Sequence, residues 1–225
     1  MPQFTKNGPV WVLDLGGDEN RFSPEWLAEV DAALDEIATS SEAAVLVTVG
    51  SDKFYTNGLD LEWVTANPGE LASYVDKIHA MFAKVLTLPV ATVAAINGHA
   101  FGGGAMLAMA HDFRVMRDDR GYFCFPEVDI LIPFTEGMAA LIQAKLTPQA
   151  AVESMTTGRR YGATDALARG IVDATAPLDS LVETASALVA PMAGKDRTTL
   201  GRIKQVMFAE AAATLLTAQR TDVSI

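Results

Sequence analysis

Apolar residues form short continuous runs that alternate with longer helical patterns along the first half of the chain. Residues 10–15, 43–49 and 90–96 are apolar runs of strand length, and the last two are continuous enough to be buried on both faces. Apolar positions three and four residues apart follow over residues 24–37, and an amphipathic pattern covers residues 71–88 and ends before a proline. This order predicts an α/β fold with largely parallel strand pairing.

The rest of the chain is predicted to be mostly helical. Residues 102–110 are typical of a helix that begins at a glycine cluster, and residues 113–116 of one more strand. Further helices are predicted over residues 136–146, 148–156, 163–169, 178–192 and 198–217. The tail shows little strand character, so it would be an appendage or a segment that forms oligomers.

Composition narrows the class of protein more than its function. The 225 residues include 28 acidic and 17 basic side chains, for a net charge of −11, which argues against non-specific nucleic-acid binding. The single cysteine, Cys124, excludes an internal disulfide framework, and we expect it to fill the core. No segment has the pattern of a membrane span or signal peptide, so we expect a cytoplasmic protein that binds no membrane.

Two strand-to-helix junctions carry the strongest signal of chemistry. The strands at residues 43–49 and 90–96 both lead into glycine-containing turns, and the second turn runs directly into a helix whose first N–H groups are free. If the turns lie side by side, one N–H from each would hold the same oxygen, and each such donor lowers a barrier by roughly 2.7–4 kcal/mol. The alternatives are close helix packing and phosphate binding, although neither the G-x-G-x-x-G nor the P-loop spacing is present.

Four segments, in order, resemble the crotonase (enoyl-CoA hydratase/isomerase) superfamily. They are KFYTNGLDL at residues 53–61, INGHAFGGGAMLAMAHD at 96–112, FCFPEVDI at 123–130 and GRRYGATDALARGIV at 158–172. The resemblance implies a spiral of βαβ units over residues 1–172. It also implies a helical C-terminal region over residues 173–225 that assembles homotrimers or hexamers.

The resemblance also implies an acyl-CoA thioester substrate of fatty-acid oxidation, with no separate cofactor. Leu59 and Gly103 would be the two N–H donors to the thioester oxygen. Substrate contacts are expected from Lys53, Gly58 and Gly104.

Cations for the CoA phosphates are few in this acidic chain. Besides Lys53, Arg202 and Lys204 are candidates for the nucleotide, in this subunit or a neighbouring one, although each would equally serve as a solvated surface charge. An apolar tunnel for the acyl chain would draw on Trp63, Tyr74, Met81, Met106 and Phe134, which are equally typical of a core.

One departure from the family pattern bears on the reaction. Hydratases of this family use two glutamates, and the first normally stands three residues after the oxyanion glycine, where this chain has Met106; the second corresponds to Glu127. A thioether transfers no proton, whereas isomerisation of a 3-enoyl-CoA to a 2-enoyl-CoA needs only one carboxylate that moves a proton from C2 to C4. The sequence therefore favours isomerisation with Glu127 as the base, its pKa raised by apolar neighbours.

Glu136 leaves an alternative open. It is a candidate second acid, which would restore hydration or support another crotonase-type lyase or thioesterase reaction with Glu127; otherwise it opens the following helix. A third hypothesis is an acyl-CoA-binding homologue without catalysis. The three histidines, His79, His99 and His111, show no metal-ligand spacing, and no metal site is predicted.

Overall fold

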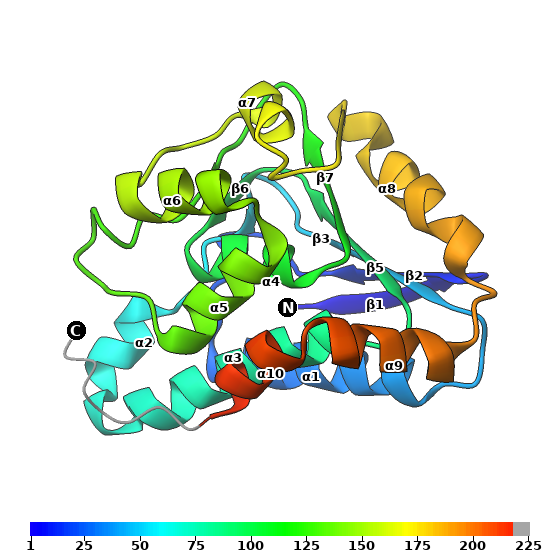
Figure 1. The fold of residues 1–225 in the computed structure, drawn as a ribbon, viewed down its shortest axis with the longest axis horizontal. Coiled ribbons are helices and arrows are strands. Elements are labelled where there is room, and N and C mark those ends of the chain that lie inside the picture. Colours follow the sequence, from blue (N-terminus) through cyan, green and yellow to red (C-terminus); the bar gives the residue numbers. More distant parts are fainter. Residues whose placement is uncertain (218–225) are drawn as a thin grey trace.

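A twisted, mostly parallel sheet forms the frame of the protein (Figure 1). The computed structural model describes residues 1–217. In spatial order the sheet strands are β1 (Gln3–Asn7), β2 (Val10–Asp14), β3 (Val45–Val49), β5 (Ala91–Ile96), β7 (Phe113–Arg117) and β9 (Ala174–Ala176). Only the pairing of β1 with β2 is antiparallel within this sheet, so the predicted α/β class and parallel pairing are confirmed.

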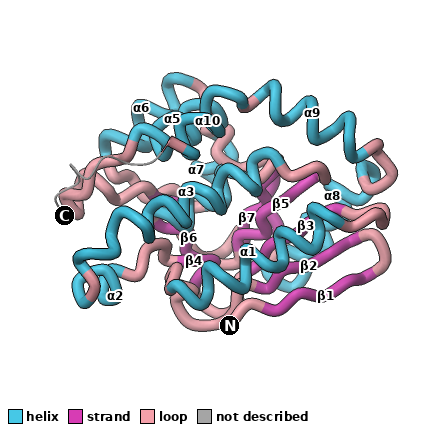
Figure 2. The backbone as a smooth tube through the Cα atoms, turned by 90° about the horizontal axis from the view of Figure 1, so that it is seen from below, coloured by secondary structure: helices cyan, strands magenta, loops and turns pink. Residues whose placement is uncertain are grey.

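The two faces of the sheet are covered by different helices (Figure 2). Leu46 of β3 belongs to the core beneath α1 (Pro24–Thr39) and α3 (Leu71–Thr87). Its neighbours Val45 and Val47 point to the opposite face, because side chains alternate along a strand, and pack with α8 (Leu181–Val189). Burial on both faces explains why these strands are continuous apolar runs.

A second, smaller sheet lies beside the main one. Its strands are β4 (Phe54–Thr56), β6 (His99–Phe101) and β8 (Phe123–Cys124), and all pair in parallel. Each follows a strand of the main sheet after a short connection, so three strands of one sheet feed three strands of the other. The apolar pattern did not predict these strands, because two or three residues are too few to show a period.

The remaining α-helices are α2 (Leu61–Ala66), α4 (Gly103–Ala110), α5 (Glu136–Lys145), α6 (Pro148–Thr157), α7 (Ala163–Ala168), α9 (Arg197–Met207) and α10 (Ala209–Leu216). The single helix predicted over residues 198–217 is wrong, since the chain breaks at Phe208 between α9 and α10. Over residues 178–192, α8 is flanked by two short 3₁₀ turns.

The C-terminal region is tied to the sheet as well as to other helices. β9 pairs with β7, which corrects the expectation that the tail has little strand character. Lys204 of α9 is buried, and its Nζ donates to Asp112 at 2.8 Å and to the Val90 carbonyl at 3.1 Å, so it is not free to bind a nucleotide as predicted. The division at residue 172 stays a prediction.

Candidate functional site

The two glycine turns identified in the sequence lie side by side. The Gly50 N–H donates to the Asn97 side-chain oxygen at 2.9 Å, so the turn after β3 is fastened to the turn after β5. The His99 N–H donates to the Lys53 carbonyl at 2.9 Å, and a Cβ added to Gly98 would lie 2.1 Å from the same carbonyl oxygen. Only glycine permits this approach of the two backbones.

The turns also meet at their far ends, next to the start of α4. Gly58 has φ +77°, and a Cβ added there would lie 2.7 Å from the backbone nitrogen of Gly103. A Cβ on Gly103 would in turn lie 2.8 Å from Cδ1 of Leu59. Gly104 packs on the Thr56 carbonyl, where a Cβ would lie 2.1 Å from the oxygen. The segments that carry Leu59 and Gly103 are therefore in direct contact.

Two backbone N–H groups at this junction are without acceptors. Within residues 1–217, neither the N–H of Leu59 nor that of Gly103 is hydrogen-bonded. Gly103 is the first residue of α4, and Gly102, at φ +52°, supplies no side-chain cap. Because the free N–H groups of a helix N-terminus carry partial positive charge, this junction attracts an anionic oxygen.

Glu127 reaches the same place from the loop after β8. Its side chain is buried, the residue being 7% exposed, and its Oε2 has no hydrogen-bond partner. A Cβ added to Gly102 would lie 3.2 Å from Oε1, which places the carboxylate beside the start of α4. Burial raises the pKa of Glu127 to about 7. A buried carboxyl group with an unpartnered oxygen and a pKa near neutrality is typical of a general base.

These groups share one open cleft, the Glu127 cleft, of about 420 Å³. Leu59, Gly103 and Glu127 all line it, so the structure brings the predicted amides and carboxylate together. Apolar side chains, among them Ile130 and Ile132, supply much of its wall. Such a cleft accommodates a ligand with an apolar portion and one polar group at the amides.

The three predicted substrate contacts are not part of the cleft wall, and their role stays a prediction. Lys53, Gly58 and Gly104 do not line the Glu127 cleft. The glycines instead let the backbones pack, while the exposed Lys53 ammonium lies 5.2 Å from the ring centroid of Phe54.

Two arginines at the cleft were missed. Arg21 lies after β2 and pairs with Glu19 at 2.6 Å and Glu62 at 2.9 Å, whereas the exposed Arg160 lies 5.6 Å from the ring of Phe101. No sequence pattern singles out Arg21, because only the fold brings it to the cleft. Arg160 lies in one of the four segments that resemble the family, which was an available signal.

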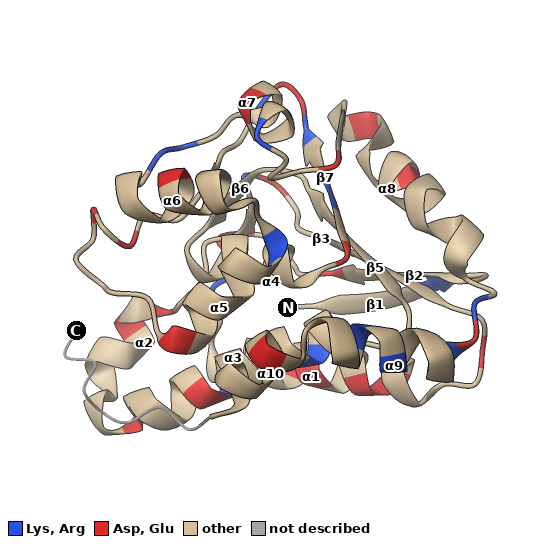
Figure 3. Ribbon diagram, viewed as in Figure 1, with Lys and Arg blue, Asp and Glu red and all other residues tan. Residues whose placement is uncertain are grey.

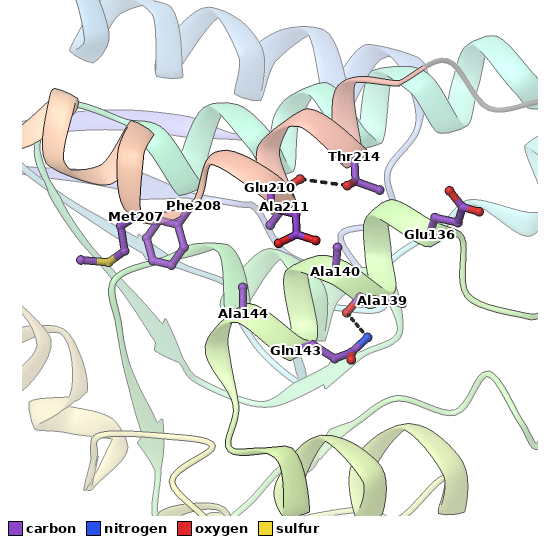
Figure 4. A pocket seen from close by; sticks show the side chains of 10 residues that line it. All are labelled: Glu136, Ala139, Ala140, Gln143, Ala144, Met207, Phe208, Glu210, Ala211 and Thr214. Carbon is purple, nitrogen blue, oxygen red and sulfur yellow. Dashed lines mark hydrogen bonds between the residues drawn. The ribbon is translucent and has the colours of Figure 1, made fainter.

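Glu136 does not belong to the Glu127 cleft. It is the exposed first residue of α5, where the Thr135 side chain caps the helix. Figure 4 shows its side chain at one end of a different hollow, the α5–α10 groove, of about 600 Å³. Ala140, Phe208 and Glu210 are also among the residues that line the groove. The structure therefore separates the two acids that the sequence places nine residues apart.

Charge and metal chemistry add little to the site. Acidic residues are spread over several helices, including α2, α8 and α10 (Figure 3). Residues 1–217 contain no group of three or more His, Cys, Asp and Glu side chains that would hold a metal ion. No helix within the same residues has the length and apolar character to span a membrane.

The fold and the cleft together define the class: an α/β protein in which two residues with free backbone amides and a buried carboxylate line one cleft. The sequence profile of the family described as enoyl-CoA hydratase/isomerase matches residues 10–225. The chain belongs to the enoyl-CoA hydratase/isomerase family.

Individual relatives agree with this assignment. The chain is 37% identical to enoyl-CoA delta isomerase 3 of Arabidopsis thaliana, over 87% of this chain and 86% of the relative. It is 30% identical to carnitinyl-CoA dehydratase of Citrobacter koseri, over 90% of this chain and 78% of the relative. A solved enoyl-CoA hydratase/isomerase family protein from Pseudomonas syringae superposes with a TM-score of 0.90 at 22% identity, covering 96% of this chain and 94% of that one. That last similarity concerns the fold alone.

Proposed function

We propose that this protein isomerises 3-enoyl-CoA thioesters to 2-enoyl-CoA thioesters. The Glu127 carboxylate removes a proton from C2, and the electron pair moves into the thioester carbonyl to give a dienolate. The N–H groups of Leu59 and Gly103 hold the resulting oxyanion. Glu127, now a carboxylic acid, returns the proton to C4, so that the C3–C4 double bond is lost and a C2–C3 double bond forms.

The observation that carries this proposal is the single buried carboxylate of the cleft. Glu127 has an unpartnered oxygen and a pKa raised to about 7, so it accepts and returns a proton near neutral pH. Met106, 1% exposed, occupies the place where the resemblance expects a second glutamate for water addition. Glu136 lies at another hollow, and the other glutamate that lines the cleft, Glu62, is exposed and paired with Arg21, so hydration lacks a second buried acid there.

Three of the relatives favour the same reaction. Three Arabidopsis thaliana proteins named enoyl-CoA delta isomerases are 33–37% identical to this chain over at least 78% of its length. Two of them are named peroxisomal, and the cytoplasmic location of this protein stays a prediction. The trimer or hexamer is likewise still a prediction.

Recognition of the CoA phosphates is assigned to the arginines of the cleft rather than to Lys53. Arg21 and Arg160 line the same cavity as Glu127, and a guanidinium binds phosphate oxygens through paired N–H donors. Arg160 has no carboxylate within ion-pair distance among residues 1–217, so its guanidinium is available to an anionic ligand.

The test is to incubate the protein with 3-hexenoyl-CoA and 2-hexenoyl-CoA in separate reactions. We expect turnover of the first and little water addition to the second. Efficient hydration of 2-hexenoyl-CoA would contradict the isomerase assignment. Tight binding of both thioesters without turnover would instead indicate an acyl-CoA-binding protein without catalysis.

A further inference from the structure

A second, much smaller hollow lies next to the Glu127 cleft. This inner cavity has a volume of about 50 Å³ and shares Leu59, Glu127 and Ile132 with the cleft. The cleft and the inner cavity therefore meet at the carboxylate. A ligand whose reacting atoms lie beside Glu127 would reach the inner cavity with the part of its chain beyond those atoms.

The inner cavity is largely apolar and lies between three helices. Leu71 and Val75 of α3, Met106 of α4 and Met138 of α5 contribute to its wall. Both methionines are buried, at 1% and 6% exposed. Apart from Glu127, no charged side chain lines the cavity among the described residues. Its chemistry suits a hydrocarbon chain and excludes a charged end group.

We infer that the inner cavity receives the acyl chain beyond C4 and selects substrates of about six carbons. This inference rests on the proposed function, which places C2 and C4 beside Glu127. A dry cavity of about 150 Å³ takes up benzene, a molecule of six carbons. By that comparison about 50 Å³ holds roughly two carbons, which correspond to C5 and C6 of a hexenoyl chain.

Met106 and Met138 set this limit. A longer acyl chain must displace a methionine side chain or leave its last methylenes in water. Each methylene that stays in water lowers the binding affinity about fourfold relative to a buried one. Because methionine is unbranched and adaptable, the limit is graded rather than absolute. Met106, which stands where the hydratases have their first glutamate, thus also determines chain length.

The experiment compares kcat/KM for 3-hexenoyl-, 3-octenoyl- and 3-decenoyl-CoA in the wild type and in Met106→Ala and Met138→Ala. The matched control is Met109→Ala, which truncates a fully buried methionine of the same helix that lines neither the cleft nor the inner cavity. We expect the wild type to prefer the hexenoyl substrate. Either enlarging variant should raise the decenoyl-to-hexenoyl ratio about tenfold, since two or more methylenes gain a buried place. The control should leave this ratio unchanged.

Binding keeps this inference separable from the proposed function. Dissociation constants of hexanoyl- and decanoyl-CoA, measured by calorimetry, need no turnover. If no 3-enoyl-CoA reacts but the enlarging variants shift binding toward decanoyl-CoA, the reaction is wrong and the chain-length site stands. If 3-enoyl-CoA is isomerised with the same chain-length profile in the wild type and in folded Met106→Ala and Met138→Ala, the inference is overturned. Thermal melting identifies which variants fold.

Discussion

The Glu127 cleft and the α5–α10 groove each present a glutamate to a hollow, yet only one has the properties of a reactive site. The groove is the larger, at about 600 Å³ against about 420 Å³, but its Glu136 is exposed at a helix start. Glu127 is 7% exposed with an unpartnered oxygen. Burial with an unpartnered oxygen, rather than the size of the hollow, therefore identifies the carboxylate that is prepared for proton transfer.

The difference arises from the local structure in which each glutamate stands. The Thr135 hydroxyl caps α5, and Glu136 is the first residue of that helix. The Glu136 carboxylate therefore interacts favourably with the helix dipole and stays exposed to water. Glu127 follows β8, and the turn it begins is closed by the Ile132 N–H, which donates to the Glu127 carbonyl at 3.1 Å. This turn holds the side chain at the junction of two glycine loops.

The largest expected effect comes from Glu127→Gln. The amide keeps the size of the side chain but cannot accept and return the proton, so kcat for 3-hexenoyl-CoA should fall by roughly 10²–10⁴-fold. Binding of hexanoyl-CoA should change little, because the thioester oxygen is held by backbone amides. Steady-state kinetics and calorimetry measure the two quantities. Full activity in this variant would assign the base to another residue.

The second test breaks the amide pair without touching a carboxylate. Gly58→Ala places a Cβ 2.7 Å from the Gly103 nitrogen, so the two turns must separate, and we expect kcat to fall by roughly 10²-fold, as when one oxyanion donor is lost. Gly8→Ala is the control, because Gly8 also has positive φ, at +59°, but nothing within 4 Å of the added Cβ. Similar kinetics in the two variants would show that the clash at Gly58 has no consequence for catalysis.

The third prediction concerns pH. With the folded pKa of Glu127 raised from 4.5 to about 7, the native state keeps a proton that the unfolded chain loses between those values. Stability should therefore fall as pH rises through this window, by up to about 3 kcal/mol, and then level off. The base form is required for activity, so kcat/KM should rise about tenfold per pH unit up to about pH 7.

Glu127→Gln is the reference for this titration. The difference in free energy of unfolding between wild type and variant, measured by urea denaturation at pH 5 and pH 8, isolates the contribution of this one group. An unchanged difference between the two pH values would show that the Glu127 carboxyl titrates normally in the folded protein.

The sequence predicted the parts of the fold that leave a periodic or continuous pattern. The runs that became β3 and β5 are buried on both faces, and α3 has a clear apolar stripe, so each was placed to within two residues. β9 and the small sheet were missed because strands of two or three residues are specified by their neighbours in space. Their pairing depends on contacts between segments far apart in the chain.

The candidate site divides in the same way. Glu127 and the two amide-bearing residues were predicted through the family resemblance, which depends on local features of the sequence such as the glycine-containing turns and the Pro-Glu pair. Arg21 could not be found, since its position at the cleft depends on the loop after β2 reaching α2, where it pairs with Glu62. Lys53 was predicted to contact the ligand because it precedes the first turn, but it does not line the cleft.

The smallest expected effect, Glu136→Gln, is the direct test of the comparison between the two hollows. It is the same substitution as Glu127→Gln, made at the acid of the α5–α10 groove. We expect kcat to change less than twofold, because Glu136 lies outside the cleft, while the free energy of unfolding falls by about 0.5 kcal/mol through loss of a charge at the start of α5. A loss of activity as large as that of Glu127→Gln would make Glu136 a second acid after all. It would require α5 to bring its first turn toward Glu127 when the thioester binds.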